Sequence, residues 1–171
     1  MEDEFTWRLK LKSAEAGDSN TQFELATMYY SDIGVIQDRT KSIHWFTESA
    51  KQGHVDAQQF LGMTYAIGQD VTRDYEQSFY WLSKSAEQWN GKAQNNLGLM
   101  YANGKGVIKD YMQAYKWWSL AIATEQPLLD REEMIKNRSH VEGEMTNEEI
   151  AEAQRLVIEW TETYQKNCKP S

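Results

Sequence analysis

The residues Gly104, Lys105 and Gly106 follow an apolar run and are the first candidate for chemistry in this sequence. A phosphate-binding loop needs four residues between its first glycine and the Gly-Lys pair, followed by Ser or Thr for a metal ion. Here five residues separate Gly98 from Gly104. The dinucleotide-binding fingerprint would need a third glycine where Lys109 stands, and it should follow a strand. Neither motif is met, so we expect a structural turn here.

The other chemically reactive residue types do not form a recognisable constellation. His44, His54 and His140 are scattered, without the spacing of metal ligands. Cys168 is the single cysteine, which excludes an intrachain disulfide or a thiolate metal cluster and fits a reducing compartment. No nucleophile elbow is present. We therefore expect no catalytic residue, no metal site and no cofactor.

Composition narrows the class of partner. The chain has 171 residues, a formal net charge of −8 and a pI near 4.9. This charge argues against nucleic acid as a partner, because affinity for phosphate needs clustered Lys and Arg. Basic proteins are suitable partners for an acidic surface, although such a surface also serves solubility. The N-terminal residues lack an apolar stretch, so we expect a cytoplasmic protein without membrane insertion; a removed export signal would leave no trace here.

An internal period of 36 residues dominates the sequence. Eight columns are identical in three successive copies, whereas chance would give about 0.1 such columns at ordinary amino-acid frequencies. They are Ser13, Ser49 and Ser85; Ala14, Ala50 and Ala86; Gln22, Gln58 and Gln94; Leu25, Leu61 and Leu97; Tyr29, Tyr65 and Tyr101; Val35, Val71 and Val107; Asp38, Asp74 and Asp110; and Trp45, Trp81 and Trp117.

Each copy predicts two helices joined by a turn. The Leu and Tyr columns recur at helical spacing beside a small residue, which predicts a first helix (helix A) near 20–31, 56–67 and 92–103. The Asp column then caps a second helix (helix B), with Gln77 and Gln113 placed as in capping boxes. The small residues Ala26, Gly62 and Gly98 leave a notch in helix A, and we expect the tryptophans of the helix B stripe, Trp45, Trp81, Trp117 and Trp118, to fill such notches.

The ends of the chain differ from the repeats, as the ends of a stack must. Residues 5–16 supply only a helix B, and residues 128–142 form a helix between Pro127 and Gly143. Thr146 and Glu149 form a capping box for a last helix that reaches about Gln165. We therefore divide the chain into a capping helix (1–17), three repeats (18–53, 54–89 and 90–125) and a C-terminal helical cap with a tail (126–171).

The repeated unit resembles a known family. The pattern AQxxLGxxYAxGxxVxxDYxxxxxWLxKSA, from Ala57 to Ala86, resembles the Sel1-like repeat, a variant of the tetratricopeptide repeat, and MTNEEIAEAQRLVIEW resembles the closing helix of bacterial members. Together these segments cover nearly the whole chain. The sequence departs from the pattern at four positions, Thr21, Asp32, Asp70 and Trp89.

The resemblance implies an all-α fold, an α-solenoid of three helix-turn-helix repeats whose helices A line a concave binding surface. Transferred position by position, the concave face of tetratricopeptide helices corresponds here to Asn20, Phe23, Thr27, Tyr30, Ser31, Asp56, Gln59, Met63, Ala66, Ile67, Lys92, Asn95, Leu99, Ala102 and Asn103. Five of these, Phe23, Tyr30, Met63, Ile67 and Leu99, would form an apolar ribbon rimmed by amides. Alternatively, Phe23 packs on the N-terminal helix, and Met63 and Leu99 touch adjacent repeats.

The resemblance also implies a non-enzymatic module for protein–protein interaction. The sharper hypothesis is a cytoplasmic immunity protein that occludes a basic toxin or effector; an adaptor in a signalling or secretion complex is the alternative. Disulfide-rich relatives have been linked to β-lactam binding or hydrolysis, but this chain lacks their regular cysteines. A structural subunit of a membrane complex is the remaining hypothesis. The sequence sets neither the partner nor the oligomeric state.

Overall fold

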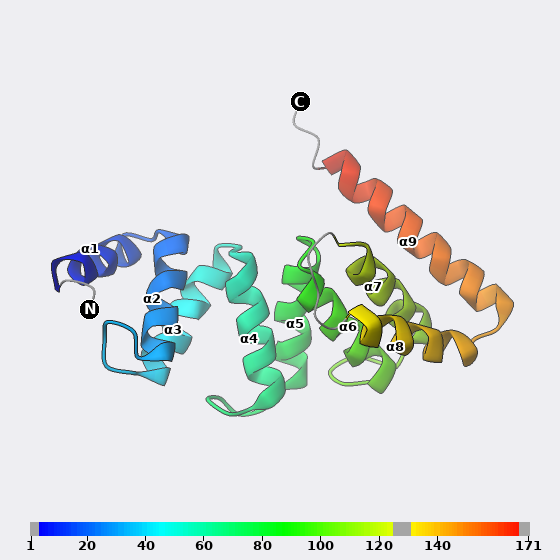
Figure 1. The fold of residues 1–171 in the computed structure, drawn as a ribbon, viewed down its shortest axis with the longest axis horizontal. Helices are drawn as coiled ribbons and strands as arrows, with labels where there is room; N and C mark the ends of the chain where they lie inside the picture. The colour runs from blue at the N-terminus through cyan, green and yellow to red at the C-terminus, as the bar shows by residue number, and fades with distance from the viewer. Residues whose placement is uncertain (1–3, 125–130, 168–171) are drawn as a thin grey trace. The chain divides into compact units, whose positions relative to one another are not determined.

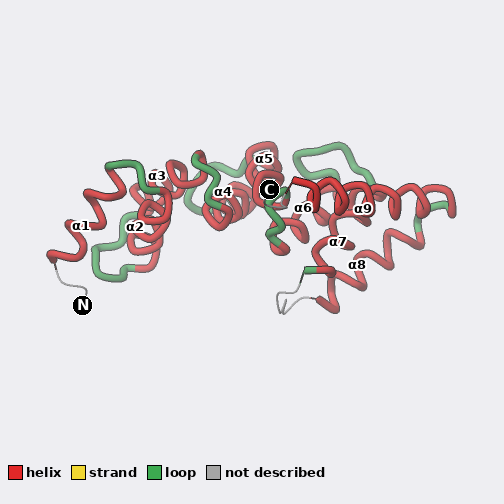
Figure 2. Tube along the Cα trace, turned by 90° about the horizontal axis from the view of Figure 1, so that it is seen from above, coloured by secondary structure: helices red, strands yellow, loops and turns green. Residues whose placement is uncertain are grey.

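The described residues fold into α-helices only, as the sequence predicts. A computed structural model describes residues 4–124 and 131–167, so Pro127 and Cys168 lie outside the described residues. Within these ranges there are nine helices and no strand (Figures 1 and 2). Their bounds are α1 Glu4–Glu15, α2 Ser19–Ser31, α3 Arg39–Lys51, α4 Val55–Ile67, α5 Tyr75–Ala86, α6 Gly91–Asn103, α7 Tyr111–Ala123, α8 Arg131–Gly143 and α9 Asn147–Asn167.

The chain forms two compact units, Met1–Gln88 (unit 1) and Trp89–Ser171 (unit 2). In unit 1, α1 packs on α2, α2 on α3, α3 on α4 and α4 on α5. In unit 2, α6 packs on α7, and α7 contacts both α8 and α9. The helix A–helix B pairs expected from the period are therefore α2–α3, α4–α5 and α6–α7.

The aspartate column caps the three helices B. Asp38, Asp74 and Asp110 adopt extended backbone, and each side chain accepts a hydrogen bond from a backbone N–H in the first turn of α3, α5 or α7. This satisfies an amide that the helix itself leaves unpaired. The box expected before the last helix is complete: Thr146 N donates to Glu149 Oε2 at 2.8 Å, and Glu149 N donates to Thr146 Oγ1 at 3.2 Å.

The Gly-Lys-Gly segment is a turn, as expected. Gly104 ends α6 in the left-handed region (φ 65°) and donates its N–H to Met100 O. The preceding copies end in the same way, at Asp32 (φ 57°) and Gly68 (φ 73°). The required feature is thus a left-handed residue that closes helix A, which glycine provides without strain and which aspartate, a residue that tolerates this region, also adopts here. No copy other than the third places a lysine next to it.

A tryptophan fills the notch in one helix A, as expected, but not in another. A Cβ atom on Gly62 would lie 2.5 Å from Leu82 Cγ, and one on Gly98 would lie 2.7 Å from the indole of Trp118. The notches therefore receive Leu82 and Trp118, each one residue after Trp81 or Trp117. The expectation is confirmed for Trp118 and is wrong at Gly62, where Leu82 takes the place expected for a tryptophan. Trp81 and Trp117 are buried as predicted, and Trp45 is half-buried.

Repeated polar residues in the core join neighbouring elements. Ser49 Oγ donates to Ser19 O at 2.7 Å, and Ser85 Oγ donates to Val55 O at 3.0 Å, 36 residues further on. The glutamine column behaves alike, since Gln22 Nε2 donates to Ala14 O and Gln58 Nε2 to Ala50 O. These bonds satisfy groups that would otherwise be buried without partners, and they explain why polar columns repeat as strictly as apolar ones.

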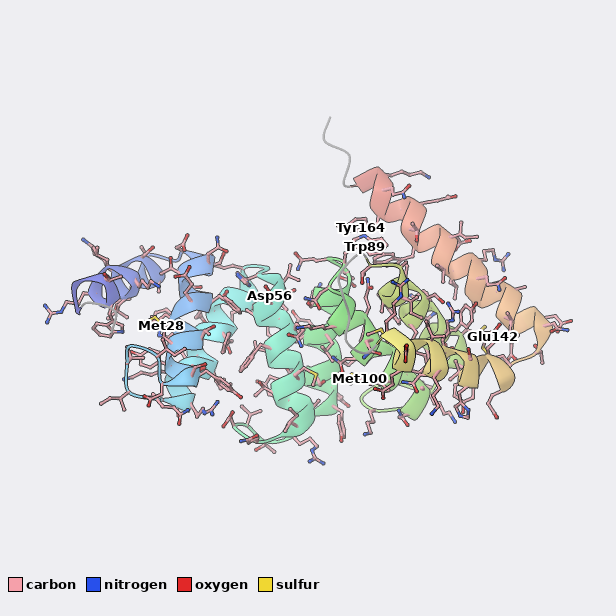
Figure 3. All side chains as sticks on the ribbon, in the orientation of Figure 1. Met28, Asp56, Trp89, Met100, Glu142 and Tyr164 are labelled. Carbon is pink, nitrogen blue, oxygen red and sulfur yellow. The ribbon has the colours of Figure 1, made fainter. Side chains whose placement is uncertain are left out.

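An aromatic cluster holds α9 in unit 2. The ring of Trp160 lies 4.9 Å from that of Trp89 and 5.8 Å from that of Trp117, and it stacks on Tyr164 at 5.6 Å. Figure 3 shows Trp89 and Tyr164 side by side. Trp89 has a positive φ of 64°, where the two earlier copies carry Gly17 and Gly53. A glycine position has thus been taken by a bulky residue that packs against the last helix.

Candidate protein-binding surface

Most of the concave-face residues predicted from the sequence are accessible on helices α2, α4 and α6. In unit 1 the exposed ones are Asn20, Thr27, Ser31, Asp56 and Ile67, and the half-buried ones are Phe23, Tyr30, Gln59, Met63 and Ala66. In unit 2 the exposed ones are Lys92, Leu99 and Asn103, and the half-buried ones are Asn95 and Ala102. The larger aliphatic side chains that face solvent here are Ile67, which is 53% exposed, and Leu99, which is 37% exposed.

Phe23 is partly buried by contacts within unit 1. Its ring meets that of Phe46 edge-on at 5.6 Å and stacks on the imidazole of His54 at 4.4 Å. His54 in turn caps α4, since Ala57 N donates to its Nδ1 at 3.3 Å. Phe23 thus packs against α3 and the start of α4, which differs from the alternative that paired it with the N-terminal helix. Only one part of its ring remains for a partner.

Tyr30 belongs to an ordered cluster at the end of α2. Its ring meets Phe60 edge-on at 5.0 Å, and the guanidinium of Arg39 lies 3.7 Å above the ring centroid. Arg39 Nη1 also lies 3.8 Å from Asp70 Oδ2. Asp70, which departs from the family glycine, lies in the turn between α4 and α5 and also provides an ion-pair partner. Arg39 is not among the residues predicted from the sequence, although a basic residue directly after the capping Asp38 is visible there.

In unit 2 the residues on α6 divide into structural and accessible ones. Asn95 Oδ1 accepts a hydrogen bond of 2.9 Å from Trp118 Nε1, so Asn95 supports the filled notch. Asn103 Nδ2 donates to Leu99 O at 2.7 Å, which orders the last turn of α6. Leu99 and Lys92 remain as the accessible apolar and charged side chains of this helix face.

Exposed isoleucines in the turns are a feature that the sequence analysis did not identify. Ile36 is 87% exposed and Ile108 is 88% exposed, and they occupy the same column, where the middle copy carries Thr72. A threonine in this column shows that folding does not require an apolar residue here. The signal that could have revealed them is an isoleucine two residues before the capping aspartate.

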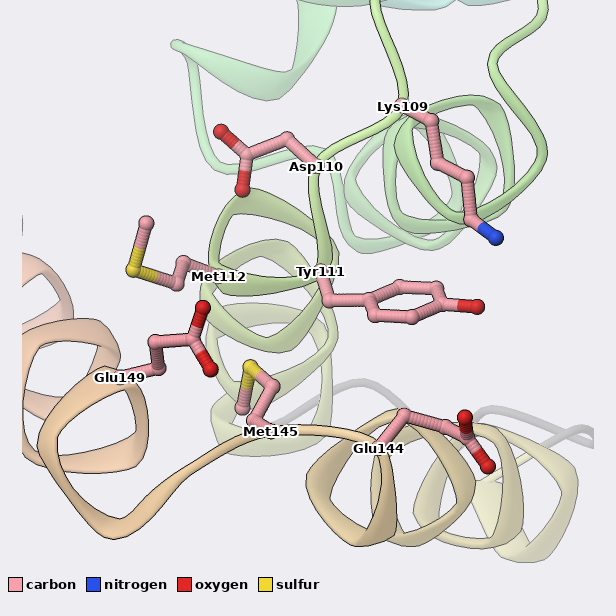
Figure 4. Close-up of a pocket in the computed structure, with 7 residues that line it drawn as sticks. All are labelled: Lys109, Asp110, Tyr111, Met112, Glu144, Met145 and Glu149. Atoms are coloured by element: carbon pink, nitrogen blue, oxygen red, sulfur yellow. The ribbon is translucent and has the colours of Figure 1, made fainter.

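Unit 2 also holds a small open pocket between the start of α7 and the α8–α9 turn (Figure 4). Its volume is about 260 Å³, and it is lined by Lys109, Asp110, Tyr111, Met112, Glu144, Met145 and Glu149. Asp110 and Glu149 already cap helices, and Lys109 Nζ lies 4.4 Å from the Tyr111 ring centroid. The carboxylates of Asp110 and Glu149 therefore have structural roles.

The side chains that could bind a metal ion lie apart from one another in the described part of the chain. Among the described residues no group of three His, Cys, Asp or Glu side chains could hold a metal ion. His44 and His140 are exposed, and His54 has the capping role given above. In the same part of the chain, no helix combines the length and the apolar character that crossing a membrane requires.

Comparison with known proteins agrees with the repeat architecture. The family model of the Sel1 repeat matches residues 19–54, 55–88 and 91–123. The crystal structure of a Sel1 repeat protein from Oxalobacter formigenes is 32% identical with a TM-score of 0.71, over 79% of this chain and 98% of that one. No curated protein matches.

A second solved structure is c5321, a protective antigen present in uropathogenic Escherichia coli strains that displays an SLR fold. It is 28% identical with a TM-score of 0.58, over 95% of this chain and 43% of that one, so this chain spans less than half of its length. Sel1 repeats are in general modules for protein–protein interaction, and proteins built from them are typically non-enzymatic scaffolds. Because the three repeat matches span more than half of the sequence, this chain belongs to the Sel1 repeat family.

Proposed function

We propose that this chain is a non-enzymatic module that binds a partner protein through the accessible faces of its helices A. The observation that carries the proposal is the exposure of Ile67 and Leu99 on these helices, which leaves part of each apolar side chain in contact with solvent. The helices A also carry exposed amide and hydroxyl groups, namely Asn20 and Thr27 in unit 1 and Asn103 in unit 2. Apolar side chains together with such polar groups are the usual composition of a protein-binding surface.

The partner we propose is a basic protein. The chain carries a net charge of −8, so opposite charge would steer the encounter. A toxin or effector occluded by a cytoplasmic immunity protein fits this description, and the binding would inhibit it sterically. If the immunity hypothesis is right, co-expression with the product of a neighbouring toxin gene will restore growth of the host cell. Continued growth arrest alongside intact binding would favour an adaptor role instead.

The helix A face is tested by capture of a partner from the extract of the host, followed by mass spectrometry. We expect Ile67→Asp and Leu99→Asp to reduce recovery of the same protein at least tenfold, since a buried carboxylate without a partner is costly at an interface. The matched control is Ile158→Asp on α9, because Ile158 is 57% exposed and lies outside the proposed face. Phe23 and Tyr30 are unsuitable for this test, since both also pack within unit 1.

Two results would contradict the proposal. Equal recovery with all three variants would move the contact away from the helices A. Turnover of a chromogenic β-lactam by the purified chain, abolished by Leu99→Asp, would show an enzyme instead of a binding module.

A further inference from the structure

The residue that caps each helix A differs between the three copies. Asp18, His54 and Asn90 occupy the same column of the repeat, directly before α2, α4 and α6. All three adopt extended backbone, and each side chain accepts a hydrogen bond from a backbone N–H in the first helical turn. Of these three side chains, the imidazole is the one whose type changes charge between about pH 5 and 8.

His54 caps α4 through the lone pair of its Nδ1 atom. Ala57 N donates to His54 Nδ1 at 3.3 Å, a longer bond than the 2.7 Å and 2.9 Å of the caps at α2 and α6. A ring nitrogen that carries a proton has no free lone pair, so a protonated imidazole cannot accept this bond. Its positive charge is also unfavourable at the N-terminus of a helix, where the dipole favours negative groups. Protonation of His54 therefore removes the cap of α4.

The same imidazole contacts a residue of the proposed binding face. The ring of Phe23 on α2 stacks on it, with 4.4 Å between the centroids and 15° between the planes. A cation also packs favourably on the face of an aromatic ring, so this contact survives protonation of His54, whereas the hydrogen bond from Ala57 does not. The change is therefore confined to the first turn of α4.

The charges near the cap do not replace the lost hydrogen bond. On α2, α3 and α5 the charged residues nearest to it occur in pairs of opposite sign. They are Glu24 with Lys10 at 3.0 Å, Glu48 with Lys51 at 2.8 Å, and Lys84 with Glu87 three residues later. The first turn of α4 adds Asp56, which is exposed, so solvent and salt screen its attraction for a charged imidazole.

We propose that His54 is a pH-sensitive cap, which keeps the first turn of α4 closed while its imidazole is neutral and opens this turn when the imidazole is protonated. The helices α2 and α6 keep their caps over the same range, because an amide does not ionise and a carboxylate stays charged there. Phe23 and Asp56 adjoin the opened turn, so the opening changes the helix A face of unit 1. This last step rests on the proposed function, whereas the opening of the cap does not.

NMR of the full chain between about pH 8 and about pH 5 tests the cap. Long-range proton–nitrogen spectra show whether His54 Nδ1 carries a proton, and the amide signal of Ala57 reports the hydrogen bond. We expect Nδ1 without a proton at the upper end of the range, and an upfield shift of the Ala57 amide proton with the same midpoint as the imidazole signal of His54. The amides of Thr21 and Ala93, which hold the caps of α2 and α6, should not move at this midpoint.

Variants assign the transition to one imidazole. His54→Asn introduces the cap residue of α6 and should abolish the transition of the Ala57 amide while the fold is retained. His140→Asn is the matched control, because His140 is an exposed histidine on α8 in unit 2. A proton on His54 Nδ1 at the upper end of the range, an Ala57 signal that does not move, or a transition that persists in His54→Asn would each overturn the pH-sensitive cap.

Capture of the partner at about pH 7.5 and about pH 5.5 tests the effect on the helix A face. We expect recovery by the native chain to fall at least threefold more at the lower pH than recovery by His54→Asn. An equal fall for both chains would show that the cap does not act on this face, and would overturn that step. Absence of a captured protein at either pH would contradict the proposed function alone, because the NMR transition needs no partner.

Discussion

At the residue scale, Gly62 and Gly98 show that a position without a side chain can determine which residue packs there. The indole of Trp118 lies where a Cβ on Gly98 would be, and Leu82 does the same at Gly62. Asn95 then receives the indole N–H of Trp118, so the contact is both filled and hydrogen-bonded. We expect a change of either residue alone to destabilise the contact, because protein interiors are packed almost without free volume.

We predict that Gly98→Ala destabilises the chain by about 1–3 kcal/mol, because the new methyl group overlaps a fully enclosed ring that has no room to move. Urea denaturation followed by circular dichroism measures the change. Gly143→Ala is the matched control, since a Cβ there meets nothing within 4 Å. Equal stability of Gly98→Ala and Gly143→Ala would show that Trp118 can shift, and would contradict the tight fit.

The capping aspartates Asp18 and Asp38 link stability to pH. Hydrogen bonds from Thr21 lower the pKa of Asp18, first from its hydroxyl and then from its backbone N–H, and the backbone N–H of Lys41 lowers the pKa of Asp38. A carboxylate whose pKa is lower in the folded state stabilises that state above its unfolded pKa of 3.8, and this contribution is lost as the pH falls through the folded value.

We therefore expect Asp38→Asn, which keeps a capping oxygen but loses the charge, to be less stable than the native chain at pH 7. The difference should shrink below about pH 4, as the native carboxylate becomes protonated. Thermal unfolding at a series of pH values measures it. A difference that stays constant down to pH 2 would show that the charge of Asp38 contributes nothing.

At the element scale, α9 depends on one residue that breaks a local rule. Trp89 adopts the left-handed backbone of a glycine position and packs against Trp160 and Tyr164. The left-handed region costs a bulky residue about 1–2 kcal/mol. Burial of most of an indole stabilises by about 2 kcal/mol, and each well-placed aromatic pair adds about 1 kcal/mol. Trp89 Nε1 is buried without a hydrogen-bond partner among the described residues, which offsets about 1 kcal/mol of this gain. The packing still outweighs the strain, and the departure from glycine is explained by α9.

The corresponding prediction is that Trp89→Gly lowers the stability of unit 2 by about 1–2 kcal/mol, although it relieves the backbone. Hydrogen exchange should show faster exchange of the α9 amides, with α2 and α3 as internal reference. An increase in stability would mean that the αL strain dominates the aromatic contacts, and would reverse our explanation of the substitution.

At the scale of the whole molecule, the features that matter for function are repetition and net charge. Each repeat presents the same helix pair, so a surface residue can vary between copies while the Asp, Ser, Gln and Leu columns keep the fold. The accessible residues of α2, α4 and α6 do vary in this way. The net charge of −8 acts over longer distances than any of these contacts.

If the partner of the helix A face is basic, its association rate should fall at least tenfold between about 50 and 500 mM NaCl, because salt screens the attraction that steers the encounter. The dissociation rate should change much less, since apolar contacts hold the complex. Surface plasmon resonance separates the two rates. An association rate independent of salt would exclude charge steering and with it a strongly basic partner.

The sequence by itself determined the period, the helices, the caps of the helices B and of the last helix, and the turn chemistry. These features depend on residues close together in the chain: Asp38 and the amide of Lys41, or Gly104 and Met100 O, lie within a single turn. The interactions that form these features are local, and the 36-residue period repeats the same pattern in three copies. The family resemblance rests on these same repeated columns, so it too could be found from the sequence.

Only the tertiary structure decided which side chains meet across elements. Phe23 faces Phe46 and His54, Trp118 fills the notch at Gly98, and Trp89 packs on the last helix, all through contacts between residues distant in sequence. The helix period gives the buried stripe but not which of two adjacent aromatic residues enters a given notch. That choice depends on the angle and offset at which two helices pack, which is set by all the side chains between them.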